Sequence, residues 1–227
     1  MKLSNGYTCF TGIALILGGI LPIIGMAIRP LLVEQNFNFQ LADFATITAH
    51  HAIWIVSYQV MVFGLFVRLA GLVALGSLHS HTLARTVVWP GVAITLAAIV
   101  VNGISAGYYM HMGFWGADQL KNATDAAKGA FLDNIRPGSE LMICLERMAK
   151  MFFSLGLTVL GVGLALGKVV PRWLGVIGAA IGMAGMMTLF AIPLSHTVFI
   201  PFDIAIAAWL VVLGALVSRG VGQESAG

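Results

Sequence analysis

Charged residues are scarce in this 227-residue chain, where Asp, Glu, Lys and Arg together make up only 9% of the sequence. A water-soluble domain carries roughly a quarter of its residues as charged side chains, which cover its surface. The hydrophobic share of 59% and the mean hydropathy of +0.95 agree with this shortage. The composition excludes an ordinary soluble domain and predicts an integral membrane protein that contacts the lipid bilayer.

Basic clusters and cysteine motifs are missing as well. The net charge is +3, but the Lys and Arg residues stand mostly singly between apolar runs. Nucleic-acid binding needs a basic patch or stripe, so we expect no nucleic-acid partner. The two cysteines, Cys9 and Cys144, lie in apolar segments without a spacing motif. Packing residues are the expected interpretation, rather than a disulfide or a metal pair.

Long apolar runs are what the chain has instead. A helix needs about 20 apolar residues to cross roughly 30 Å of hydrocarbon. The sequence therefore predicts an all-α polytopic membrane protein, with a single transmembrane domain over residues 1–227 that forms a six-transmembrane-helix bundle. The predicted spans cover residues 8–28, 52–77, 87–110, 141–167, 172–193 and 200–218. The first apolar run is longer than a signal-peptide core of about 7–15 residues, so we expect a retained span.

The distribution of basic residues predicts the orientation of the bundle. With the N-terminus inside, the inner segments are basic and contain no acid before Glu224, whereas the outer loops mix both signs. The positive-inside bias then places both termini in the cytoplasm. The basic residues of the inner segments are Lys2, Arg85, Lys168, Arg172 and Arg219.

Residues 117–136 form a long polar connection on the outer side. Apolar side chains recur there at helical spacing, charged side chains lie largely on the other face, and Pro137 and Gly138 follow. This pattern predicts a short amphipathic helix on the outer surface. Such a helix could cover the bundle as a lid or serve only as a solvated connector.

Titratable side chains gather at the outer ends of the predicted spans, while the inner half of the membrane contains no acid. The outer set consists of His50, His51, His111, Glu140, Glu146, His196 and Asp203. Arg68 stands apart, because it lies deep in the second span without an acidic partner at its depth. We expect its side chain to snorkel toward the cytoplasm.

Polar side chains also follow three helix faces below these ends. Polar groups that face lipid are costly, so these faces are expected to point into the bundle and form a polar funnel. A structural hydrogen-bond network would use the same residues. The faces are Glu146, Lys150, Ser154 and Thr158 in the fourth span, His51, Ile55, Tyr58 and Gln59 in the second, and Asn102, Ser105 and Tyr109 in the third. Glu146 and Lys150, four residues apart, could also neutralise each other.

The stretch YYMHMGFWG, residues 108–116, combines a histidine with aromatic rings at the outer end of the third span. Together with Trp54, these rings are typical of an aromatic belt at the membrane surface. The stretch is then an interface anchor. A metal or cofactor site there depends on the other side chains at the same depth.

Three functions are compatible with the outer cluster. The favoured one is binding of a transition metal by His51, His111 and His196, or of haem or a small apolar ligand. Tyr58, Gln59 and Asn102 would then line the cofactor pocket beside His51 and His111.

The second function is that of a membrane-embedded enzyme, in which Glu146, Asp203 and His111 act as acid and base on an apolar substrate. The third is a small-molecule transporter or a subunit of a membrane complex. The sequence leaves enzymatic activity open.

Two adjoining segments carry a resemblance. The run FFSLGLTVLGVGLALGKVV (152–170) is followed by PRWLGVIGAAIGMAGM (171–186). This glycine-rich span, short basic turn and following span resemble a group of uncharacterised bacterial six-span membrane proteins of the domain-of-unknown-function kind. The resemblance implies a bacterial inner-membrane location and a six-helix fold, and supplies no catalytic residues. Gly178 and Gly182 form a GxxxG motif, which predicts close helix packing.

Overall fold

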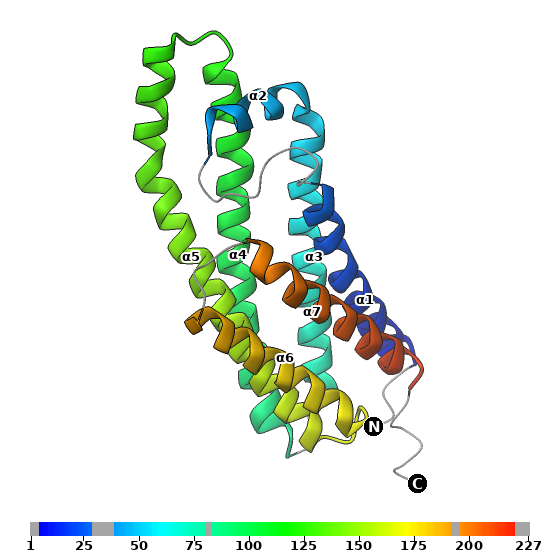
Figure 1. The fold of residues 1–227 in the computed structure, drawn as a ribbon. Coiled ribbons are helices and arrows are strands. Elements are labelled where there is room, and N and C mark those ends of the chain that lie inside the picture. The colour runs from blue at the N-terminus through cyan, green and yellow to red at the C-terminus, as the bar shows by residue number, and fades with distance from the viewer. Residues whose placement is uncertain (1–4, 29–38, 80–82, 192–195, 221–227) are drawn as a thin grey trace.

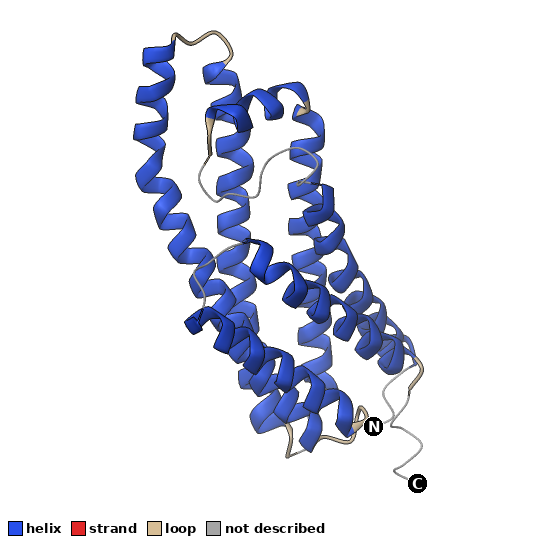
Figure 2. Ribbon diagram, viewed as in Figure 1, coloured by secondary structure: helices blue, strands red, loops and turns tan. Residues whose placement is uncertain are grey.

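The computed structural model describes residues 5–28, 39–79, 83–191 and 196–220, and their side chains except at 5 and 196–198. This part of the chain forms seven helices and no strand (Figures 1 and 2). Six of the helices are long and apolar enough to cross a membrane, which confirms the predicted all-α six-helix bundle. The helices are α1 (Asn5–Ile28), α2 (Leu41–Ala49), α3 (His51–Leu78), α4 (Arg85–Leu120), α5 (Asp125–Leu166), α6 (Arg172–Ala191) and α7 (His196–Ser218).

The six long helices pack as two groups of three. Helix α1 lies between α3 and α7 in one group, and α5 lies between α4 and α6 in the other. Contacts of α3 with α4 and of α6 with α7 join the groups. The first and last described residues lie at the same end of the bundle, opposite α2 and the connection between α4 and α5 (Figure 1).

Glycines set the close approach of the helices within each group. A Cβ atom at Gly161 of α5 would lie within 3.0 Å of backbone atoms of Gly175 and Ala179 in α6. At Gly12 of α1, a Cβ would lie equally close to the Gly214 carbonyl oxygen in α7. Membrane helices associate through such van der Waals contact, because lipid provides no hydrophobic drive between them.

The GxxxG motif of α6 is part of this packing. Gly178 lies against the ring of Trp209 in α7, and Gly182 lies against Ser154 and Thr158 in α5. Both glycines are buried. The predicted role of the motif in close helix packing is confirmed.

Helices α4 and α5 are longer than a membrane crossing. Their 36 and 42 residues correspond to about 54 and 63 Å at a rise of about 1.5 Å per residue. The prediction of a separate surface helix over 117–136 is wrong, because residues 117–120 complete α4 and residues 125–136 begin α5. The last two residues of the predicted fifth span, 192 and 193, lie outside the described residues.

Pro137 lies inside α5 and does not end it. The side chains of Ile135 and Ser139, two residues before and after it, are buried. The Tyr108 hydroxyl of α4 lies 3.5 Å from the Ser139 hydroxyl. A proline inside a helix removes one backbone hydrogen bond, and α5 continues across that defect with the contact between Ser139 and Tyr108 of α4 beside it.

The short helix α2 was not predicted from the sequence. The backbone N–H of Gln40 donates to the Asp43 carboxylate at 2.7 Å, which caps its first turn. Phe44 and Ile47 are buried, and the ring of Phe44 meets that of Phe131 in α5 with centroids 5.7 Å apart. Thus α2 packs across the end of the bundle opposite the chain termini, against residues of the segment 117–136.

His79 follows α3 at the opposite end of the bundle and is fully buried. Its Nδ1 lies 3.0 Å from the Leu75 carbonyl oxygen. Burial lowers the pKa of His79 below its ordinary value, so the folded protein resists protonation that the unfolded chain accepts. Linkage then requires the stability of the fold to fall as the pH drops below about 6.5.

We therefore expect the melting temperature in detergent to fall between about pH 7.5 and 5.5, and to fall less steeply in a His79→Gln variant. Thermal unfolding at several pH values measures both slopes. Gln59→Ala is the control, since Gln59 is exposed and carries no titratable group, so this variant is expected to keep the wild-type slope. Equal slopes in wild type and His79→Gln would contradict the assignment of this pH dependence to His79.

Candidate functional site

Arg68 lies inside the bundle, with 7% of its surface exposed. Its Nε donates a hydrogen bond of 2.8 Å to the Gly18 carbonyl oxygen of α1, and its guanidinium lies 5.6 Å from the centre of the Phe153 ring. The prediction that Arg68 snorkels toward the cytoplasm is wrong. Gly18 stands four residues before Pro22, which has no N–H to donate, so its carbonyl is left for Arg68.

Lys150 of α5 and Asp203 of α7 form an ion pair within the bundle. The Lys150 Nζ donates to both carboxylate oxygens of Asp203 at 3.0 Å, and the two side chains are 20% and 19% exposed. The Nζ also lies 5.8 Å from the centre of the Phe199 ring. The partner of Lys150 is thus Asp203, and the pair crosses between the two groups of helices.

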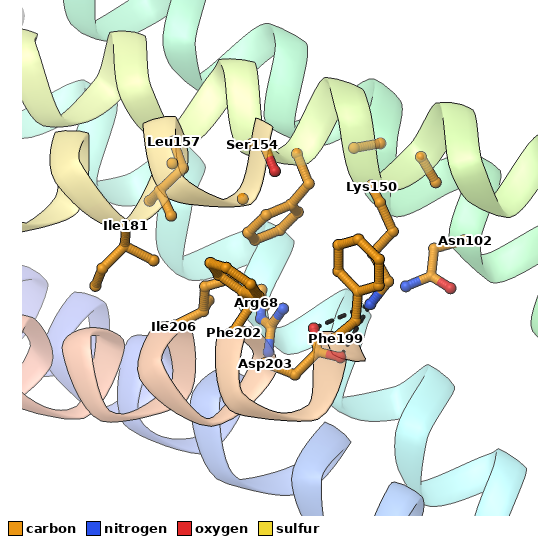
Figure 3. A pocket seen from close by; sticks show the side chains of 15 residues that line it. Arg68, Asn102, Lys150, Ser154, Leu157, Ile181, Phe199, Phe202, Asp203 and Ile206 are labelled. Atoms are coloured by element: carbon orange, nitrogen blue, oxygen red, sulfur yellow. Dashed lines mark hydrogen bonds and ion pairs between the residues drawn. The ribbon is translucent and has the colours of Figure 1, made fainter. Parts of the chain in front are cut away.

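A cavity of about 40 Å³ lies beside this ion pair, within a wider hollow whose empty space, solvent at its mouth included, is about 520 Å³ (Figure 3). Helices α3 and α7 line it from one group, and α4, α5 and α6 line it from the other. Its charged lining residues are Arg68, Lys150 and Asp203, its polar ones are Asn102 and Ser154, and its aromatic ones are Phe153, Phe199 and Phe202. Two cations and one carboxylate give this lining a formal charge of +1.

A second cavity of about 30 Å³ shares Asn102 and Lys150 with the first. Glu146, 8% exposed, contributes the second carboxylate. The polar faces of α4 and α5 therefore point into the bundle, as predicted. The remaining lining residues of this cavity are Met26, Tyr58, Met61, Ser105, Ala106 and Tyr109.

The depth of the first cavity in the membrane follows from the hydrogen bond between Arg68 and Gly18 of α1. Gly18, which accepts the bond from Arg68, is the fourteenth of the 24 residues of α1. A helix of this length is about 36 Å long, close to the thickness of the hydrocarbon core. Arg68 thus lies near the middle of the membrane-spanning part of the bundle.

The predicted histidine sites lie elsewhere. His51 is half-buried, and its ring is 4.5 Å from that of Phe114, while His111 is exposed with its ring 6.4 Å from that of Trp115. Gly25 of α1 faces Ser57, and His51 lies six residues beyond that point on α3, past the end of α1. Neither histidine lines either cavity.

The other predicted site residues divide in the same way. Tyr58, Asn102 and Glu146 line the second cavity, and Asp203 lines the first. Gln59 is exposed and lines neither. The side chain of His196 lies outside the described residues, so its predicted role as a metal ligand stays a prediction.

Metal ligands do not gather in the part of the chain that the structure describes. No three His, Cys, Asp or Glu side chains lie there in an arrangement that could hold a metal ion. The two cysteines, Cys9 and Cys144, are free and exposed.

The stretch 108–116 has two different faces. Tyr109 is buried, whereas His111, Phe114 and Trp115 are exposed as an aromatic belt requires. Trp54, which was predicted to belong to this belt, is buried instead and donates its Nε1–H to the Met110 carbonyl oxygen at 3.3 Å. One face of the stretch 108–116 is therefore an interface anchor, and the other face packs within the bundle.

Sequence reasoning missed Arg68 and the three phenylalanines of the first cavity as site residues. For Arg68 a signal exists: a carbonyl four residues before a proline lies on another predicted span and lacks its helical donor. Arg147 was left without a partner, and its Nη2 donates to the Leu189 carbonyl oxygen at 3.0 Å, near the end of α6. Favourable contact of a cation with the carbonyls at a helix C-terminus is expected.

No family model, no curated protein and no solved structure matches this chain. The fold and the cavities by themselves define a class, a multi-pass helical membrane protein with ionisable side chains inside its bundle.

Proposed function

We propose that this protein binds a small amphipathic molecule in the first cavity, as a membrane-embedded binding or transport protein. The observation that carries the proposal is the Lys150–Asp203 ion pair beside open space at membrane depth. Ionisable side chains inside a membrane bundle are costly, and they commonly mark a ligand or ion pathway. An ion pair that served only to join helices would need no cavity beside it.

The composition of the cavity wall suits a molecule with both polar and apolar parts. Ligand sites are mostly apolar and contain a few polar groups that orient the ligand. Here the phenylalanines, together with Leu157, Ile181 and Ile206, supply the apolar surface. The charged and amide side chains supply the polar contacts.

The cellular setting of the proposal comes from the sequence. The basic inner segments and the resemblance to bacterial six-span proteins support an inner-membrane location with cytoplasmic termini. In that orientation the second cavity, with Glu146, lies toward the outer side of the first. We propose that the ligand reaches the first cavity by this outer route.

The alternative functions that involve a metal, haem or partner chains have direct tests of their own. A visible absorption spectrum and a metal analysis of the purified protein detect haem or a transition metal. Stoichiometric co-purification detects partner chains. A Soret band or a stoichiometric metal would replace the present proposal.

A cavity-filling variant tests the proposal. Protein in phosphatidylcholine nanodiscs is titrated with the fluorescent amphiphile dansylaminoundecanoic acid. Ile181→Trp, which places a large ring at the cavity wall, is expected to weaken probe binding about tenfold, a loss of roughly 1.4 kcal/mol. Ile177→Trp is the matched control, because Ile177 lies one turn away on the same helix and is 43% exposed.

Equal binding by wild type and both variants would mean that the probe binds only to lipid or to the outer surface. That result would overturn the proposal.

A further inference from the structure

We infer that the first cavity recognises an anionic head group, such as a carboxylate on an apolar chain, through Arg68 and Lys150, and that Asp203 competes with this head group for the same cations. The inference rests on the proposed function and adds the chemical class of the ligand. It depends on the unused donors of Arg68, on the charge of the cavity and on its apolar wall.

Arg68 has more hydrogen-bond donors than the one that bonds to Gly18. Its Nε is taken by the Gly18 carbonyl, but its two Nη groups make no hydrogen bond to any residue within the described ranges. The side chain is nevertheless 93% buried and lines the cavity, where its guanidinium lies beside Asp203 (Figure 3). A planar guanidinium with free Nη groups fits the two oxygens of a carboxylate.

The charge of the cavity favours the same class of ligand. Arg68 and Lys150 contribute two positive charges to the lining and Asp203 one negative charge. Within this lining a bound anion brings the total to zero, which matters because an uncompensated charge is costly away from water. The remaining carboxylate nearby, Glu146, lies in the second cavity, which shares Lys150 with the first. A cationic head would raise the total to +2 instead.

The apolar wall distinguishes an amphipathic acid from a small inorganic anion. The guanidinium of Arg68 lies 5.6 Å from the centre of the Phe153 ring, and the Nζ of Lys150 lies 5.8 Å from that of Phe199. Phe202 and Ile206 lie on the next turns of α7 and line the same space. A chain of methylene groups would bury apolar surface here, whereas phosphate or chloride would leave this wall in contact with water.

Asp203 is the carboxylate that already occupies the position of the ligand head. Both of its oxygens accept from the Lys150 Nζ at 3.0 Å. A second carboxylate bound to the same cations would be repelled by Asp203 at close range. Removal of the Asp203 charge should therefore strengthen anion binding, although it breaks an ion pair of the folded protein.

The test compares three twelve-carbon amphiphiles of different charge. Dodecanoate, dodecanol and dodecyltrimethylammonium each displace the dansyl probe from protein in phosphatidylcholine nanodiscs, at alkaline pH where dodecanoate is ionised. For each variant, the dodecanol concentration at half displacement is divided by the dodecanoate concentration at half displacement. This ratio is compared between variants, because a change in a variant's affinity for the probe affects both concentrations equally. In the wild type we expect dodecanoate to act at about tenfold lower concentration than either of the others.

The variants should change this ratio in opposite directions. Asp203→Asn should raise the preference for dodecanoate several-fold, and Arg68→Gln and Lys150→Met should lower it. If Lys150→Met fails to fold, the double variant Lys150→Met with Asp203→Asn is compared with Asp203→Asn alone, and a lower preference is expected. A wild-type ratio near one, or a preference lowered by Asp203→Asn, would overturn the inference.

The two proposals fail in distinguishable ways. If Ile181→Trp has no effect on the probe, the proposed function fails. If Ile181→Trp weakens the probe but the three amphiphiles displace it equally, only the anionic head group fails.

Nanodiscs that also contain phosphatidylglycerol separate the two sources of such a head group. Weaker displacement by dodecanoate in these discs identifies an anionic lipid as the occupant, and unchanged displacement identifies a free single-chain acid. Either result supports the anionic class.

Discussion

Replacement of Gly161 by alanine is expected to destabilise the folded bundle by about 3 kcal/mol, at the upper end of the usual cost of overpacking. The added Cβ would lie within 3.0 Å of backbone atoms of Gly175 and Ala179 in α6. Backbone atoms cannot rotate away as a side chain can, so α5 and α6 would have to move apart. Reversible unfolding in mixed micelles, followed by circular dichroism, measures the change in the free energy of unfolding.

Gly103→Ala in α4 is the matched control. Nothing lies within 4 Å of a Cβ atom at Gly103, so no contact is disturbed. Alanine is the better helix former by up to about 1 kcal/mol, and the control should be neutral or slightly stabilising. If the two variants have the same free energy of unfolding, the close contact between α5 and α6 does not contribute to the stability of the bundle.

Lys150→Met is expected to cost about 3 kcal/mol of stability, because it removes the ion-pair partner that donates to both oxygens of the largely buried Asp203 carboxylate and leaves only the Arg68 guanidinium nearby. The cost should come mainly from the buried carboxylate, which loses the donor of both its hydrogen bonds, and not from the lost attraction. The double variant Lys150→Met with Asp203→Leu is therefore expected to recover most of the loss. The same unfolding experiment measures both variants.

An exposed ion pair on the same helix provides the control. Lys128 and Asp125 lie 2.9 Å apart, and the Asp125 side chain is 98% exposed. Lys128→Met should cost no more than about 0.5 kcal/mol, as surface pairs contribute little. Equal costs at Lys150 and Lys128 would show that the pair inside the bundle is no more important than the one at the surface.

The transmembrane helices could be predicted because their signal is local. Each apolar run is long enough to cross the membrane, whatever packs beside it. The ends of the helices were less predictable. The Pro137–Gly138 pair indicated the end of a helix, but α5 continues through it, beside the contact of Ser139 with Tyr108 on α4. Helix α2 was missed because its buried residues depend on contacts with α4 and with Phe131 of α5, which its own nine residues do not reveal.

The candidate site was predicted in part for the same reason. The polar face of α5 was correctly expected to point inward, since a polar stripe on one helix needs no knowledge of its neighbours. The partner of Lys150 is 53 residues away on α7, and the acceptor of Arg68 is 50 residues away on α1. Pairings between helices depend on rotation and depth together, and hydropathy specifies neither.

The division of the bundle into two groups bears on how the first cavity could open. Arg68 is fixed to α1 within one group, whereas the Lys150–Asp203 pair joins α5 of one group to α7 of the other. A rocking motion between the groups would leave the Arg68 bond intact while it separates Lys150 from Asp203. Such a motion would keep Asp203 beside Arg68, because both belong to the group of α1, α3 and α7, and would leave Lys150 as the cation whose charge an arriving acid compensates.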